Sequence, residues 1–66
     1  MKKTKQARHL EPGDVMLESE GGKDFRDTVV KVFNTGIGVQ VTYREEDTGE
    51  QSTTTYMPTT EIEVEA

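Results

Sequence analysis

Apolar and polar residues alternate along the middle of the chain, and this period of two predicts β-structure. The clearest stretch is residues 37–44, where four apolar side chains fall on one face: Ile37, Val39, Val41 and Tyr43. A helix would scatter these groups around its circumference, whereas a strand places them all on one side. We therefore expect a half-buried strand over residues 37–44.

Three further segments have strand character. Residues 15–20 place Val15 and Leu17 on one face. Residues 52–57 are rich in threonine and end at Pro58, which cannot donate to a ladder, so we expect an edge strand there. Pro58 and the residues after it could form a single 3₁₀ turn before a short last strand at 62–65.

Residues 25–33 predict a strand that bends across the centre of the fold, because β-branched valines favour a pleated surface and both faces are partly apolar. Alternation places Phe25, Val29 and Phe33 on one face of this strand. It places Thr28, Val30 and Val32 on the opposite face. A tight hairpin turn should follow at 34–36, with Gly36 in the left-handed region.

Five short strands with short connections and no helical period predict an all-β domain. Closing the sheet into a small barrel is the economical way to bury both of its faces and to remove its edges. The five-stranded OB-fold is a competitor, but it usually has longer strands and a helix before the fourth. We therefore expect a five-stranded SH3-like small barrel over residues 10–65.

Length and composition limit what such a domain can do. The chain has 66 residues, so we expect one domain with a small core. It has no cysteine, which excludes disulfides, thiolate zinc sites and a cysteine nucleophile, and suits a reducing, cytoplasmic compartment. We expect no membrane segment and no signal peptide, because no apolar run approaches the roughly 18 residues of a membrane span.

The net charge of −5 is unevenly distributed. The first eight residues carry four bases and no acid: Lys2, Lys3, Lys5 and Arg8. The rest of the chain carries four bases against all thirteen acids, a net charge of −9. Because the basic start has nothing large and apolar to bury, we expect residues 1–9 to be a flexible tail.

Several segments resemble SH3-like small β-barrels of the Tudor, Agenet and KOW type. Residues 10–15 (LEPGDV) are similar to the turn that begins their first strand, and residues 25–32 (FRDTVVKV) resemble their second strand. Residues 38–43 (GVQVTY) look like their third strand, and residues 58–62 (PTTEI) resemble the turn before their last. The resemblance implies a binding domain and leaves the ligand open.

The same resemblance places Phe25 and Tyr43 where Tudor domains carry cage aromatics, which hold methylated lysine or arginine by cation–π attraction. Glu46 or Asp47 could supply the acid that accompanies such a cage. The alternative is that the four aromatic rings of the chain pack in the core or on strand faces.

Two acidic groups are candidate protein-binding residues. The first is a loop cluster of Glu45, Glu46 and Asp47, which lacks the spacing of a calcium loop. The second is the alternating set Glu61, Glu63 and Glu65, which shares one face of the last strand. This acidic stripe could dock a basic partner, or it could protect an exposed strand from pairing with other chains.

Catalysis is not expected. His9 is the only histidine and has no serine or cysteine partner at catalytic spacing, and the chain contains no phosphate-binding glycine loop. A barrel of this size also has little room for a desolvated cleft. We predict no catalytic residue, no metal and no cofactor.

The leading interpretation is a small non-catalytic module that docks onto a protein partner through its acidic surface, as a phage or bacterial accessory or regulatory protein. One alternative is a nucleic-acid-associated factor that touches phosphate through Lys2, Lys3, Lys5 and Arg8 alone, because the acidic body would repel phosphate. The other is a Tudor-like reader of methylated lysine or arginine. We expect a monomer or a weak homodimer with no membrane contact.

Overall fold

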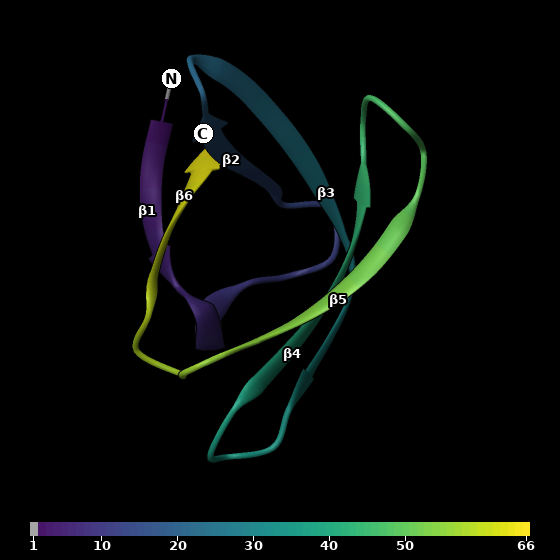
Figure 1. The fold of residues 1–66 in the computed structure, drawn as a ribbon. Helices are drawn as coiled ribbons and strands as arrows, with labels where there is room; N and C mark the ends of the chain where they lie inside the picture. Colours follow the sequence, from purple (N-terminus) through teal and green to yellow (C-terminus); the bar gives the residue numbers. More distant parts are fainter. Residues whose placement is uncertain (1) are drawn as a thin grey trace.

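The computed structural model describes residues 2–66, and these form one antiparallel sheet of six strands (Figure 1). The strands are β1 (Lys2–Gln6), β2 (Val15–Glu20), β3 (Lys23–Asn34), β4 (Val39–Glu45), β5 (Gln51–Tyr56) and β6 (Glu61–Glu65). A short 3₁₀ helix, η1 (Ala7–His9), follows β1. No helix within the described residues is long and apolar enough to cross a membrane. The all-β prediction is confirmed.

The sheet is curved but open. Its spatial order is β1-β6-β2-β3-β4-β5, so β1 and β5 are its edges, and within residues 2–66 they form no ladder with each other. The expected closure into a barrel is therefore not observed. After β5 the chain turns at Pro58, where the amide of Thr60 donates to the carbonyl of Met57 at 3.0 Å, and it continues into β6 between β1 and β2.

The start of the chain is a strand where we expected a flexible tail, so six strands form rather than five. Residues 2–6 pair with β6 as strand β1, while residue 1 lies outside the described part. The pairing brings Lys2 to 3.6 Å from Glu63, and Lys5 lies 2.9 Å from Asp14. Ala7, which follows, is completely buried. Pairing with a distant acidic strand and the burial of Ala7 thus stabilise a segment that has little apolar surface of its own.

The remaining five strands lie close to their predicted positions, but a β-bulge changes which side chains face the core. The register of β3 against β4 shifts between Val29 and Lys31. A bulge adds one residue to a strand, so the alternation of faces is inverted beyond it. Val29 is therefore buried while Phe33, which alternation placed on the same face, is 56% exposed.

The hairpin between β3 and β4 has the predicted turn. Gly36 has a φ of 88°, and its amide donates to Asn34 Oδ1 at 2.9 Å. Ile37 lies in this turn rather than in β4 and is 92% exposed, which corrects its expected place on the buried face.

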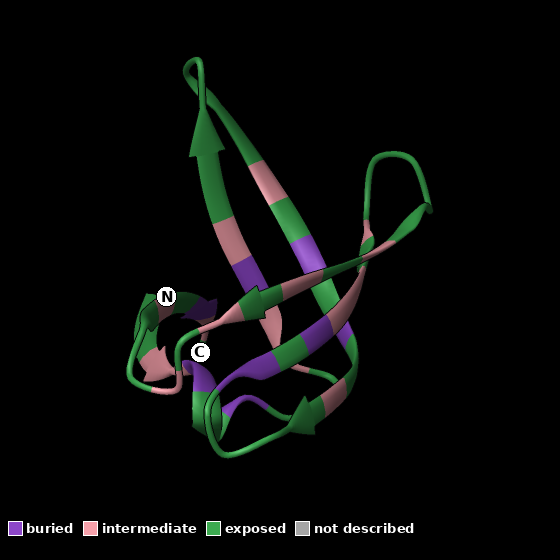
Figure 2. Ribbon diagram, turned by 60° about the horizontal axis from the view of Figure 1, so that its bottom comes forward, coloured by how far each residue is buried: buried purple, intermediate pink, exposed green. Residues whose placement is uncertain are grey.

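Seven apolar side chains make the core: Ala7, Leu10, Met16, Val29, Val39, Val41 and Val64. They come from η1 and the residue after it and from β2, β3, β4 and β6, and buried segments of these elements are purple in Figure 2. Val41 has no exposed surface, whereas Val30 on β3 is 41% exposed.

The core assignment predicts different costs for two valines on neighbouring strands. Val41→Ala should lower the free energy of unfolding by about 2 kcal/mol, because it removes buried methyl groups and leaves a void. Val30→Ala should cost less than about 1 kcal/mol, since its side chain is partly in water. Urea denaturation of the two variants measures both values, and equal losses would contradict this core.

Candidate functional site

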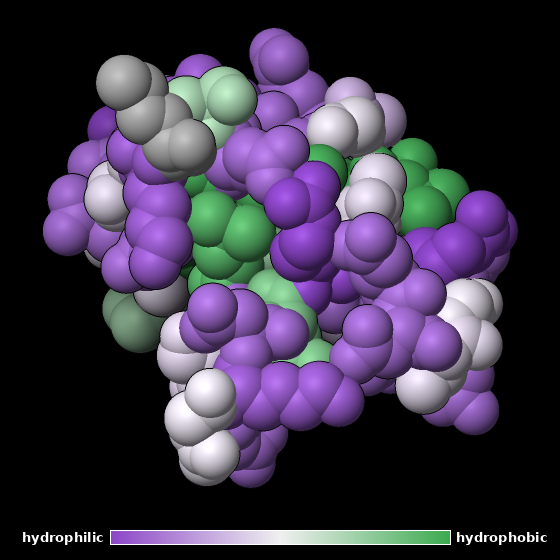
Figure 3. Space-filling view, turned by 90° about the horizontal axis from the view of Figure 1, so that it is seen from above, coloured by the Kyte–Doolittle hydropathy of each residue, from purple (hydrophilic) through white to green (hydrophobic). Residues whose placement is uncertain are grey.

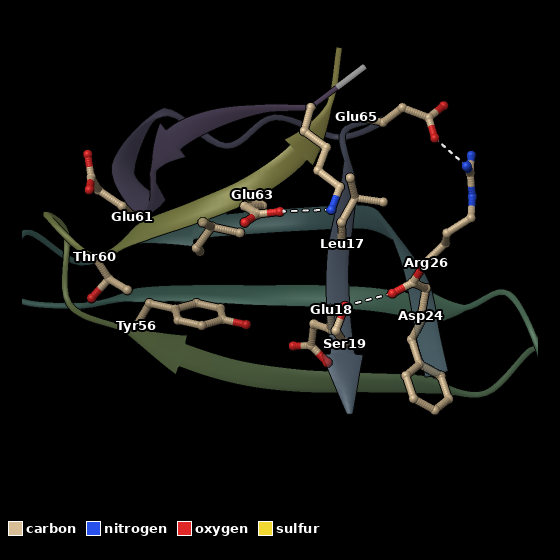
Figure 4. Close-up of a pocket in the computed structure, with 13 residues that line it drawn as sticks. Leu17, Glu18, Ser19, Asp24, Arg26, Tyr56, Thr60, Glu61, Glu63 and Glu65 are labelled. Atoms are coloured by element: carbon tan, nitrogen blue, oxygen red, sulfur yellow. Dashed lines mark hydrogen bonds and ion pairs between the residues drawn. The ribbon is translucent and has the colours of Figure 1, made fainter. Parts of the chain in front are cut away.

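A groove opens where β6 diverges from β2. The two strands share a single register pair, Met16 with Val64. Beyond it, residues 18–20 are paired with β3 alone, and residues 61–63 with β1 alone. The groove encloses about 630 Å³ and is lined from β2, β3 and β6, by Lys2 of β1 and by the end of β5 and the turn after it. Figure 4 shows Tyr56 reaching into it from β5.

The groove combines an apolar part with an acidic surround. Four half-buried apolar or aromatic side chains contribute to its lining: Leu17, Phe25, Tyr56 and Ile62. Five acids lie around them: Glu18, Asp24, Glu61, Glu63 and Glu65. From above, apolar surface is likewise enclosed by hydrophilic side chains (Figure 3).

Arg26 joins the two acidic groups that the sequence singled out. Its Nε lies 2.8 Å from Glu46, in the loop after β4, and its Nη1 contacts Glu65 at the end of β6. The hydrogen bond and charge of Glu65 raise the pKa of Arg26, and Glu46 adds to this effect. The loop acids and the β6 acids are therefore neighbours on the surface, and part of their charge is balanced by Arg26.

Basic residues of the chain balance further acids of these groups. Lys2 contacts Glu63, and Lys23 lies 3.5 Å from Asp47. Glu18 and Glu61 differ, because within residues 2–66 neither has an ion pair. They lie on the β2 side and the β6 side of the groove respectively (Figure 4). The uncompensated negative charge of the groove thus resides on these two carboxylates and on Asp24, which accepts a hydrogen bond from Ser19 Oγ but has no ion pair within residues 2–66.

Asp27 adds a buried carboxyl to the same concave side. It is 4% exposed, and no hydrogen bond or ion pair reaches its side chain from the described residues. Burial raises its pKa, and the charges of Glu18, Glu45 and Asp47 raise it further.

Tyr56 responds to the same acids. Its pKa is raised by burial first and then by Glu18, Tyr43 and Asp27. The inner surface near the groove is therefore electronegative. Sequence reasoning passed over Asp27, although its position two residues from both Phe25 and Val29 placed it on their inward face.

The two aromatics of the resemblance have different surroundings. Phe25 contributes to the groove, and the Nζ of Lys23 lies 5.3 Å from its ring centroid. Tyr43 is half-buried against the core and its hydroxyl lies 3.1 Å from Thr54 Oγ1. Tyr43 does not contribute to the groove, where Tyr56 is found instead. The structure therefore does not bring Phe25 and Tyr43 together there.

The four basic residues near the start divide into two kinds. Lys5 is held by Asp14, whose carboxylate also accepts the amide of Glu11 at 2.9 Å. Burial alone would raise the pKa of Asp14, but these hydrogen bonds and the charges of Lys5 and Lys3 lower it. Lys2 is paired with Glu63, while Lys3 and Arg8 are exposed and have no ion pair within residues 2–66.

Comparison with known proteins assigns no family to this arrangement. No protein-family model matches the chain, and no curated protein matches it significantly. In the described part of the chain, no group of three or more histidine, aspartate or glutamate side chains is placed to hold a metal ion. The geometry and charge of the groove are therefore the basis for the function proposed below.

Asp27 predicts a pH-dependent effect of its replacement. A carboxyl whose pKa is raised by folding stabilises the fold below its ordinary value of 3.8, and this contribution is lost as the pH rises through the folded-state value. Asp27→Asn should therefore be more favourable to stability at about pH 7 than at about pH 3.

Urea denaturation of wild type and variant at both pH values measures this difference. Asp14→Asn is the control of opposite sign, because the pKa of Asp14 is lowered and its replacement should therefore be less favourable to stability at about pH 7 than at about pH 3. An Asp27→Asn variant whose effect on stability is equal at both pH values would contradict the raised pKa.

Proposed function

We propose that this chain is a small non-catalytic binding module that docks onto a protein partner through the groove between β2, β5 and β6. The observation that carries the proposal is the pair of uncompensated carboxylates, Glu18 and Glu61, beside the apolar side chains of Leu17 and Ile62. The partner segment that fits this chemistry is basic and carries at least one apolar side chain.

Each part of the groove has a separate role in this proposal. Apolar surface buried against Leu17, Tyr56 and Ile62 would supply affinity at about 25 cal/mol per Å². Glu18 and Glu61 would attract cationic side chains and set the orientation of the segment. The excess of acids over bases in the chain would also speed encounter with a basic partner.

The two alternatives have less support. Phosphate binding by the basic residues would have to compete with Glu63 for Lys2 and with Asp14 for Lys5. A cage for methylated side chains built from Phe25 and Tyr43 would need two rings that do not share the groove.

We further propose that the open sheet is a variant of the SH3-like small barrel, and that the chain acts as an accessory or regulatory protein of phage or bacterial type. The order β6-β2-β3-β4-β5 supports the first idea, because it is a run of antiparallel neighbours curved around one core. The small size and the acidic, cysteine-free composition of the chain are the features that support the second idea.

A defined peptide pair tests the binding proposal. One peptide of about ten residues alternates lysine with leucine and serine, and the other has glutamate in place of lysine. In a ¹⁵N NMR titration, the basic peptide should shift the amide signals of Glu18, Tyr56 and Ile62, and the acidic peptide should not.

A charge-matched variant pair locates the binding. Glu18→Gln/Glu61→Gln should weaken binding of the basic peptide by about tenfold. The control, Glu11→Gln/Glu50→Gln, loses the same charge from exposed positions outside the groove and should keep most of the affinity. Equal weakening in both variants would show that binding depends on the net charge of the chain alone, and this result would overturn the proposed site.

A further inference from the structure

Strand β5 exposes an edge that carries no charge. Residues 51–60 contain no acidic or basic side chain, and β5 is the last strand on its side of the sheet. The opposite edge, β1, carries Lys2, Lys3 and Lys5 within five residues. Charges, prolines and bulges are the usual features that stop edge strands from pairing with other chains.

The β5 edge also has the regular geometry that pairing requires. Its ladder with β4 runs over six consecutive register pairs, from Val39 with Tyr56 to Arg44 with Gln51, without a shift. Pro58 lies two residues after the strand and so interrupts none of it. The outer backbone groups of β5 thus form an uninterrupted template for a further strand.

We propose that two copies of this chain associate through antiparallel pairing of their β5 strands, which joins the two sheets into one. This association goes beyond the binding role proposed for the groove, with which the β5 interface shares Tyr56. A two-fold axis relates the strands of an antiparallel pair of identical chains. If one residue of β5 faces a second residue in the other copy, that second residue therefore also faces the first. With Thr54 on the axis, Thr53 faces Thr55 and Ser52 faces Tyr56, and no charge opposes a like charge.

Side chains beside the edge favour this partner. Thr53 Oγ1 already lies 3.1 Å from Thr42 Oγ1 of β4, so a row of hydroxyls crosses the outer face and would continue into the second copy. Met57 is 71% exposed and follows directly after β5. In the two-fold arrangement Met57 lies opposite Gln51 of the second copy, which would cover part of its apolar surface.

The other edge explains why the pairing should stop at two copies. Two β1 strands would bring lysines together, and like charges opposite one another disfavour pairing. Each copy has a net charge of −5, so long-range repulsion should keep the β5 association weak at low salt. Added salt screens this repulsion and should strengthen the dimer.

Analytical ultracentrifugation of the full chain tests the proposal. From about 10 μM to about 1 mM protein, the weight-average mass should rise from monomer toward dimer, and more steeply at about 300 mM than at about 20 mM NaCl. Amide exchange at residues 52–56 should slow over the same concentration range. A monomer throughout, or a dimer that salt weakens, would overturn the proposal.

Two variants of equal charge identify the interface. Thr53→Lys/Thr55→Lys places lysines opposite each other across the pair and should raise the dimer Kd by at least about tenfold. The control, Thr4→Lys/Thr59→Lys, makes the same charge change at exposed positions elsewhere and should leave the Kd within about threefold of wild type. Circular dichroism establishes that both remain folded. Equal dimer Kd values in the two folded variants would overturn the β5 interface.

Discussion

The contact between Met16 and Val64 is the point on which the rest of the sheet depends. It is the one register position that joins β6 to β2 within residues 2–66, and both side chains are almost fully buried. Two backbone hydrogen bonds, from Ala7 to Thr60 and from Arg8 to Pro58, tie the β1–η1 segment to the turn before β6. Because β2 and β6 separate after this contact, the same interaction that completes the core also defines the groove.

The concave face of the sheet is apolar at the core and electronegative next to it, and this difference determines where we expect a partner to bind. Val29 and its neighbours exclude water at the core, whereas Glu18 and Asp27 make the adjacent surface electronegative. Burial of a carboxyl group costs stability when it is ionised, and burial accordingly raises the pKa of Asp27, so the needs of the core do not explain this residue. Asp27 itself lies outside the lining of the groove, so the charge that a cationic partner would meet there comes from Glu18 and the other acids of the groove.

The local pattern of the sequence was sufficient to predict most strands but not their surroundings. The alternation from Val39 to Tyr43 placed β4 correctly because side-chain period is a local property. Strand β1 was missed because its stability comes from β6, nearly sixty residues away. Phe33 is exposed because of a β-bulge that the local sequence pattern did not predict. The acidic residues were found by composition, but the ion pairs that Arg26 makes with Glu46 and Glu65 required the fold to bring β3, β6 and the loop after β4 together.

A ¹⁵N-edited NOESY spectrum of the full chain, combined with amide exchange, tests the six-stranded sheet and its groove most directly. A sheet in which β2 and β6 share one register pair should give cross-strand contacts between the backbones of Met16 and Val64, none between Glu18 and Ile62, and slowed exchange in β1. A continuous β2–β6 ladder past Glu18 would contradict the groove. Fast exchange throughout residues 2–6, with no contacts to β6, would contradict the six-stranded sheet.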